Sequence, residues 1–270
     1  MSEERRYPLP TDKVRLEVAE GVATVTFDNP AKRNALDMSM MEGVTVALDL
    51  IAGDDAVAVV VVTGAGGRAF VSGADISEFA DRRTSVDARQ AYGRVAATMM
   101  RAWDALDKPV VAMITGYCIG GGLLTAMRAD IRVATPQSRF AVPAARLGVG
   151  YEYSGVEQLA QLVGPAWAAE ILFTGRHLGA EEALRIGLVN RLVADDRIGA
   201  EVGELAAAIA ANAPLTVRAC KAALREWRRP SAQRDLDAVH TMVESCFASS
   251  DYVEGQRAFL EKRPPHFTGR

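Results

Sequence analysis

The 270-residue sequence has few cysteines and no surplus of basic residues, and each shortage excludes a class of protein. Its three cysteines, Cys118, Cys220 and Cys246, have no CxxC spacing, so we expect neither a disulfide framework nor a metal site. Free thiols of this kind favour a reducing, cytoplasmic location. The 31 Lys and Arg residues face 34 Asp and Glu residues, a formal net charge of −3, which argues against nucleic acid as a partner.

Long apolar runs are also missing. The longest, residues 56–62 and 205–211, are far shorter than the ~20 residues that a membrane-spanning helix needs, so we expect no membrane partner. Residues 1–13 are polar and predict a flexible lead-in without the apolar stretch of a secretory signal. Only three histidines occur, all beyond residue 176, and they give no pattern for a Ser/His/Asp triad. What remains is a globular chain with 49% hydrophobic residues.

The first half of the sequence predicts strands that alternate with helices. Two short alternating segments, 14–18 and 22–27, flank Glu20-Gly21 and predict a β-hairpin. Apolar residues at helical spacing predict a helix over 40–51, and the β-branched run 57–63 is typical of a strand buried on both faces. We therefore expect an α/β fold that begins as ββαβ.

Further along, the same reasoning predicts a helix over 92–106 and strands over 110–115 and 131–134. The last third shows helical periodicity with little strand signal between its helices. We expect a core over residues 14–200 and a helical C-terminal region over 201–270.

Two glycine clusters each follow a predicted strand. The first, Gly64 to Ala69, fits the loose GxGxxG/A fingerprint, but the chain continues as an extended segment where a dinucleotide site needs a helix. A nicotinamide-dependent enzyme therefore stays a minor alternative. The second, Gly116 to Gly122, opens a predicted helix, whose free N–H groups favour negative charge. Alternatively, this segment has only a structural role, as a tight strand-to-helix turn that packs against a neighbouring element.

Several segments together resemble the crotonase, or enoyl-CoA hydratase/isomerase, family, and they occur in family order over nearly the whole chain. They are Asn29–Leu36, Ala69–Ile76, Lys108–Val111, Gly116–Gly122, Ala129–Ile131, Phe140, Leu172–Gly175, Ala180–Ala183, Gly187–Asn190 and Phe259–Lys262. The resemblance implies a spiral of ββα units with a C-terminal helical region, assembled as a homotrimer or a dimer of trimers. It also implies an acyl-CoA substrate and no separate cofactor.

By this resemblance, the backbone N–H groups of Ala74 and Gly121 form an oxyanion hole for the thioester carbonyl. Two fixed donors stabilise the negative charge that develops on that oxygen, and losing one typically costs ~3–4 kcal/mol. The resemblance also assigns residues to coenzyme A, with the solvated surface as the alternative for the basic ones. They are Lys32, Arg33, Ser72, Asp75, Ile76, Phe259 and Lys262.

The sequence departs from the family at two positions. Hydratases of this family use two glutamates, one two residues after the triple glycine and one just after the proline that follows the Phe140 strand. This chain has Leu124 and Ala144 at those positions. Neither side chain can transfer a proton. Glu152 and Tyr151 follow, and relatives of other specificities carry an acid or a tyrosine in this region. A carboxylate in an apolar pocket suits proton transfer, although Glu152 could instead pair with Arg146 or cap a helix.

We therefore expect an acyl-CoA-processing enzyme in which Glu152, with Tyr151, supports isomerase, decarboxylase or thioester-hydrolase chemistry rather than standard hydration. The alternative is an acyl-CoA-binding protein without catalytic activity. The sequence does not identify the acyl group.

Overall fold

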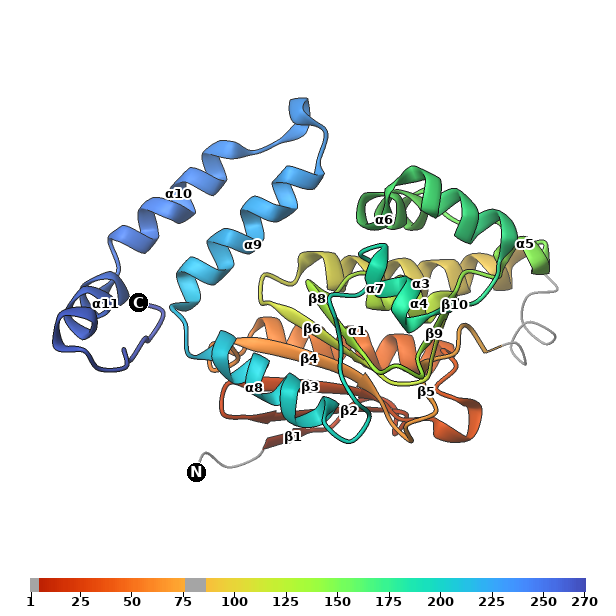
Figure 1. Cartoon of the computed structure of the whole chain (residues 1–270), viewed down its shortest axis with the longest axis horizontal. Coiled ribbons are helices and arrows are strands. Elements are labelled where there is room, and N and C mark those ends of the chain that lie inside the picture. The colour runs from red at the N-terminus through yellow and green to blue at the C-terminus, as the bar shows by residue number, and fades with distance from the viewer. Residues whose placement is uncertain (1–4, 76–85) are drawn as a thin grey trace.

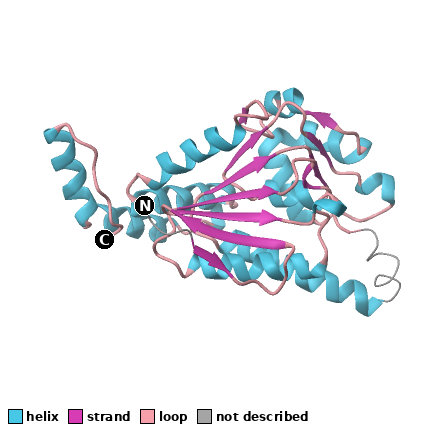
Figure 2. Cartoon of the chain, turned by 90° about the horizontal axis from the view of Figure 1, so that it is seen from below, coloured by secondary structure: helices cyan, strands magenta, loops and turns pink. Residues whose placement is uncertain are grey.

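The structure is a computed structural model of the chain that describes residues 5–75 and 86–270 (Figure 1). A seven-stranded sheet has the order β1-β2-β3-β4-β6-β8-β11, and a four-stranded sheet has the order β10-β9-β7-β5. Figure 2 shows the strands of the larger sheet side by side between layers of helices. The strands are β1 (Arg5–Tyr7), β2 (Val14–Ala19), β3 (Val22–Phe27), β4 (Val59–Gly64), β5 (Ala69–Val71), β6 (Val110–Ile114), β7 (Tyr117–Ile119), β8 (Ile131–Ala134), β9 (Arg139–Ala141), β10 (Leu178–Gly179) and β11 (Arg191–Leu192).

The helices belong to two regions of the chain. Those of the core are α1 (Met38–Ala52), α3 (Val86–Ala105), α4 (Gly121–Ala126), α5 (Ala144–Leu147), α6 (Tyr153–Thr174), α7 (Ala180–Arg185) and α8 (Ile198–Ala210). Those of the C-terminal region are α9 (Pro214–Arg228), α10 (Leu236–Phe247) and α11 (Ser250–Glu261). Short 3₁₀ turns cover Pro30–Lys32 and Ser231–Gln233.

The predicted repetition of ββα units is present. In each of three successive units the first strand lies in the large sheet and the second lies in the small one: β4 and β5, β6 and β7, β8 and β9. Neighbouring units pair in parallel in both sheets. The chain therefore advances by one strand position in each sheet per unit, which is the spiral that the sequence predicts.

The larger sheet is buried on both faces, as the β-branched run in β4 indicates. Val60 and Val62 belong to the main core, which α1 and α3 cover, whereas Val59 and Val61 pack with Val202 of α8 on the opposite face. The helix α8 therefore belongs to the core. The predicted boundary at residue 201 is wrong, since it lies inside α8 and the separate helices begin with α9.

The prediction of a flexible lead-in over residues 1–13 is wrong for residues 5–7. They form β1, which pairs antiparallel with β2, and the side chains of Arg5 and Tyr7 both contact the carboxylate of Asp54. Two ordinary polar interactions and a ladder of backbone hydrogen bonds hold this edge strand, and a polar composition gives no sign of them.

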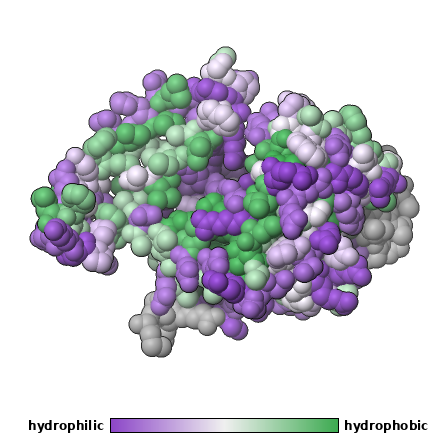
Figure 3. All heavy atoms as spheres, viewed as in Figure 1, coloured by the Kyte–Doolittle hydropathy of each residue, from purple (hydrophilic) through white to green (hydrophobic). Residues whose placement is uncertain are grey.

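The C-terminal helices α9, α10 and α11 project from the core at the side opposite α5 (Figure 1). Hydrophobic side chains gather over α9 and α10 in Figure 3, and several large ones are exposed, among them Leu224, Trp227 and Phe247. None of the described helices is long and apolar enough to cross a membrane.

Candidate functional site

The loop that follows β5 places the Ala74 N–H through a single parallel bridge. Leu36 N donates to Gly73 O at 2.8 Å, and Asp75 N donates to Leu36 O at 2.8 Å. In such a bridge the groups of the middle residue point to the other side. The Ala74 N–H is therefore held facing away from Leu36 by bonds on both sides of it.

The buried side chain of Asn34 fixes the loop that carries Leu36. Its Nδ2 donates to Ala65 O at 3.0 Å and to Ala69 O at 2.8 Å, while its Oδ1 accepts from Asn29 N at 2.9 Å. This side chain thereby joins residues 29–36 to the end of β4 and the start of β5. The sequence contained Asn34 within a family-like motif but gave no role for it.

Helix α4 begins where the second glycine cluster ends, and two glycines there have a steric reason. Gly120 adopts φ 54° and ψ −113°, which a residue with a side chain disfavours. A Cβ on Gly122 would lie 2.1 Å from Val71 O, so only glycine lets α4 start directly against β5. This segment therefore also forms the tight, closely packed strand-to-helix turn that we considered as its structural role.

The backbone of Gly121 lies close to the Ala74 N atom. A Cβ built on Gly121 would lie 4.0 Å from Ala74 N and 3.6 Å from Leu36 Cδ1. Neither N–H donates to another backbone group among the described residues. An oxyanion hole requires two unengaged donors close to one carbonyl oxygen, and these two N–H groups are the neighbouring backbone donors that could serve.

One helical turn beyond Gly121, Leu124 contacts the segment that follows α5. The position of a Cβ on Gly155 is 3.1 Å from Leu124 Cδ1 and 2.7 Å from Tyr151 Cε1, so these two side chains meet at Gly155. Ala144 is half-buried against the same core. Hydrocarbon therefore occupies both positions where the family resemblance implies carboxylates.

The Tyr151 side chain belongs to this apolar wall and carries a hydroxyl group. It is buried and has no hydrogen-bond partner among the described residues. Burial raises the pKa of Tyr151 to about 12, with smaller effects from Arg128 and Cys118. The hydroxyl therefore keeps its proton near neutral pH and can donate a hydrogen bond.

Glu152 lies next in sequence but in different surroundings. Its backbone is the N-cap of α6, its side chain makes no capping hydrogen bond, and the residue is exposed. We expected apolar side chains to enclose the Glu152 carboxylate. Within a single chain this expectation is wrong, because Glu152 lies at the exposed, extended N-cap of α6. The predicted alternative partner, Arg146, instead donates to Thr174 O.

Four of the residues assigned to coenzyme A lie together. Lys32 Nζ is 2.7 Å from Asp75 Oδ2, and Ser72 N donates to Arg33 O at 3.2 Å. The Arg33 guanidinium lies 5.7 Å from the centre of the Tyr117 ring, an aromatic neighbour that sequence reasoning missed. Ile76 lies outside the described residues.

Phe259 and Lys262 do not join this group within one chain. Both lie at the end of α11, in the C-terminal region that projects from the core (Figure 1). Phe259 is 84% exposed and borders an apolar cavity of about 670 Å³ between α9, α10 and α11. A role at the thioester site therefore requires the α11 of another copy of the chain.

Cys118 lies in β7, two residues before Gly120, and is fully buried, and burial raises the pKa of its thiol above the usual range. A thiol in such surroundings is unreactive. Among the described residues, no group of three or more His, Cys, Asp or Glu side chains could hold a metal ion. The segment after Gly64–Ala69 continues as β5, not as the helix that a dinucleotide site needs.

Three successive units each place one strand in the large sheet and one in the small sheet, and the glycine-rich segments bring the N–H groups of Ala74 and Gly121 near each other. This arrangement is that of a crotonase-fold protein. The family model for enoyl-CoA hydratase/isomerase matches residues 17–270, and the chain belongs to that family. It is 34% identical to a crotonyl-CoA hydratase of Syntrophomonas wolfei over 259 residues, 96% of this chain and 99% of the relative. It is 35% identical to a short-chain-enoyl-CoA hydratase of Clostridium acetobutylicum over 93% of this chain and 96% of the relative.

A solved structure gives the same result for the fold. An enoyl-CoA hydratase/carnithine racemase from Magnetospirillum magneticum superposes with a TM-score of 0.90 and 38% sequence identity, over 97% of each chain. The predicted fold class and family are confirmed, and acyl-CoA processing is the activity of the family.

Proposed function

We propose that this chain binds an acyl-CoA, polarises its thioester carbonyl with the N–H groups of Ala74 and Gly121, and carries out enolate-type chemistry without a pair of carboxylates. The observation that supports the proposal is the closeness of the two backbones, with a Gly121 Cβ position 4.0 Å from Ala74 N, while neither N–H has a backbone acceptor among the described residues. The hydrocarbon side chains of Leu124 and Ala144 favour reactions other than water addition, since hydration needs one group to activate water and another to supply a proton.

Three reactions on an acyl-CoA need fewer acid or base groups from the protein than hydration does. An isomerase moves one proton between two carbons, so a single acid/base group such as Glu152 suffices. A decarboxylase forms the enolate when CO₂ leaves with its bond electrons remaining on the α-carbon, so the oxyanion hole carries the step. A thioester hydrolase needs one base for water. In each, we propose that the buried, unpartnered Tyr151 hydroxyl donates a hydrogen bond to the acyl group.

A panel of acyl-CoA thioesters separates this function from binding alone. Enoyl-, dienoyl- and malonyl-type thioesters are incubated with the protein, products are identified by mass spectrometry, and affinity is measured by calorimetry. Product from any member other than a hydrated enoyl-CoA supports the proposal. Tight binding with no product from every member would establish an acyl-CoA-binding protein, and dominant hydration would overturn the assignment from Leu124 and Ala144.

Tyr151→Phe tests the hydroxyl, and stability and turnover should change in opposite directions. A buried hydroxyl without a partner costs about 1–3 kcal/mol, so its removal should raise the melting temperature of the unliganded protein. Turnover should fall by roughly tenfold or more if the hydroxyl donates to substrate. A higher melting temperature with unchanged turnover would contradict the catalytic role. Tyr153→Phe is the matched control, because Tyr153 is 76% exposed.

Glu152→Gln tests the carboxylate. The substitution keeps the size of the side chain and the N-cap backbone of α6, so folding should be unaffected. Turnover should fall by roughly 10²-fold if Glu152 transfers the proton. Glu157→Gln, one turn further along α6, is the control on the same helix. Unchanged turnover for Glu152→Gln assigns the proton transfer elsewhere.

A further inference from the structure

Two apolar side chains, Leu124 of α4 and Tyr151 just before α6, meet over a glycine and form what we call the acyl wall. A Cβ on Gly155 would lie 2.7 Å from Tyr151 Cε1, 3.1 Å from Tyr151 Cζ and 3.1 Å from Leu124 Cδ1. Any side chain at Gly155 would therefore push the two apart. Leu124 and Tyr151 are only partly buried, so each keeps some surface that a substrate can contact.

The acyl wall lies on the side of the thioester site where an acyl chain is expected. Leu124 follows Gly121 by three residues on the same face of α4, and helical side chains lean towards the helix N-terminus. Leu124 thus leans towards the thioester position. The residues assigned to coenzyme A belong instead to segments 32–33 and 72–75, beside Ala74. Since sulfur and acyl chain leave the carbonyl carbon on different sides, a coenzyme A held by those segments directs the acyl chain towards the acyl wall.

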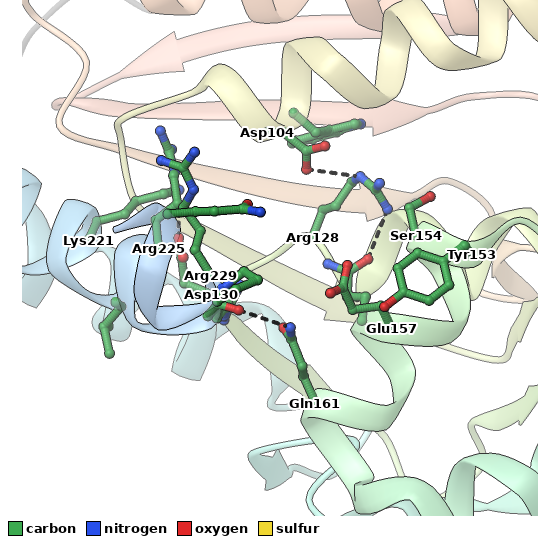
Figure 4. Close-up of a pocket in the computed structure, with 16 residues that line it drawn as sticks. Asp104, Arg128, Asp130, Tyr153, Ser154, Glu157, Gln161, Lys221, Arg225 and Arg229 are labelled. Atoms are coloured by element: carbon green, nitrogen blue, oxygen red, sulfur yellow. Dashed lines mark hydrogen bonds and ion pairs between the residues drawn. The ribbon is translucent and has the colours of Figure 1, made fainter. Parts of the chain in front are cut away.

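Hydrogen bonds hold α4 and α6 together behind the acyl wall. Arg128 Nη1 donates to Leu124 O at 3.2 Å and to Gln158 Oε1 at 2.9 Å, and Gln158 Nε2 donates to Met127 O at 2.8 Å. Figure 4 shows Arg128 next to the start of α6, with its ion pair to Asp104 of α3. The Arg128 side chain is 6% exposed, so water competes little for these bonds. The acyl wall is therefore fixed between two connected helices.

We propose that the acyl wall restricts the substrate to short acyl chains, and that Gly155 is the positioning residue that lets the Tyr151 ring close against Leu124. The inference rests on the proposed function, because it needs the thioester carbonyl to lie at Ala74 and Gly121. From there a chain meets Leu124 within about one helical turn, ~5 Å. A butyryl group fits in that length, and an octanoyl group does not.

Calorimetry of the full chain with butyryl-CoA and octanoyl-CoA tests the acyl wall. In an open apolar groove each added CH₂ would tighten binding by about fourfold. Against a fixed wall this gain is lost, so octanoyl-CoA should bind more weakly than butyryl-CoA, by about tenfold or more. Equal or tighter binding of octanoyl-CoA would overturn the acyl wall and leave the proposed function intact. Failure of both thioesters to bind would overturn the proposed function itself.

Leu124→Ala and Tyr151→Ala each remove part of the acyl wall. The affinity for octanoyl-CoA relative to butyryl-CoA should rise by about tenfold or more in each variant, as expected when about two further CH₂ groups are accommodated. Because the ratio is measured within one variant, a general loss of stability or affinity does not change it. A wild-type ratio in both variants would exclude the acyl wall.

Gly155→Ala tests the positioning role. Alanine suits a helix interior, but its methyl group must displace Tyr151 or Leu124. The octanoyl-to-butyryl ratio should therefore change by about threefold or more. Gly203→Ala in α8 is the matched control, since no atom lies within 4 Å of its Cβ position, and it should keep the wild-type ratio. A wild-type ratio for Gly155→Ala would remove Gly155 from the proposal.

Discussion

Gly121→Pro should lower kcat by about 10²- to 10³-fold while leaving the melting temperature close to that of the wild type. Proline lacks the N–H that the proposal assigns to the thioester oxygen, and its ring would occupy the direction of that bond. The first position of a helix tolerates proline, since its N–H has no intrahelical acceptor. Gly120 has no Cβ, which removes the main clash between proline and a preceding residue.

Gly121→Ala is the partner variant. It retains the N–H, and its Cβ would make ordinary contacts of 3.6 Å with Leu36 Cδ1 and 4.0 Å with Ala74 N. We expect its turnover to lie well above that of Gly121→Pro, measured on whichever thioester the wild type converts. Acyl-CoA affinity, followed by calorimetry, should change less than kcat in Gly121→Pro, because the donor stabilises developing charge more than the ground state. Equal kcat in the two variants would remove Gly121 from the mechanism.

The long elements of this fold could be predicted because their signals are local. The apolar spacing of α1 and the valine run of β4 each lie within one short window, and the structure has both within two residues of the predicted bounds. The strands of the small sheet could not be predicted in this way. β5, β7 and β9 have three residues each, too few for a period, and β7 lies inside what the sequence shows as a glycine cluster.

The residues of the candidate site likewise include some that a local sequence pattern could indicate and some that it could not. Gly121 and Ala74 could be assigned because the glycine-rich segments around them resemble those of the enoyl-CoA hydratase/isomerase family. The difference between Tyr151 and Glu152 is not visible, because neighbouring residues face a core and the solvent only once α6 has docked on α4. The unpartnered Tyr151 hydroxyl gave no signal either, because the absence of a partner depends on several elements and no local pattern records it.

Gly122→Ala should destabilise the protein by about 3 kcal/mol, since forcing extra volume into a packed interior costs about 1–3 kcal/mol and occasionally more. The added Cβ would lie 2.1 Å from Val71 O, 2.8 Å from Val71 Cβ and 2.9 Å from Val71 C. Two of these atoms are backbone atoms of β5, which cannot rotate away. The loss exceeds the gain of up to about 1 kcal/mol that alanine usually brings to a helix interior.

The displacement should also reach the site, because α4 carries Gly121 and β5 leads to Ala74. Pushing α4 from β5 separates the two N–H groups, so kcat should fall along with stability. The melting temperature should fall by about 6–12 °C, at about 2–4 °C per kcal/mol for a chain of this size. Gly203→Ala in α8 is the matched control, since nothing lies within 4 Å of its Cβ position and the variant should be as stable as the wild type or more so. A Gly122→Ala protein with wild-type melting temperature and turnover would contradict both the close contact of α4 with β5 and the oxyanion hole that depends on it.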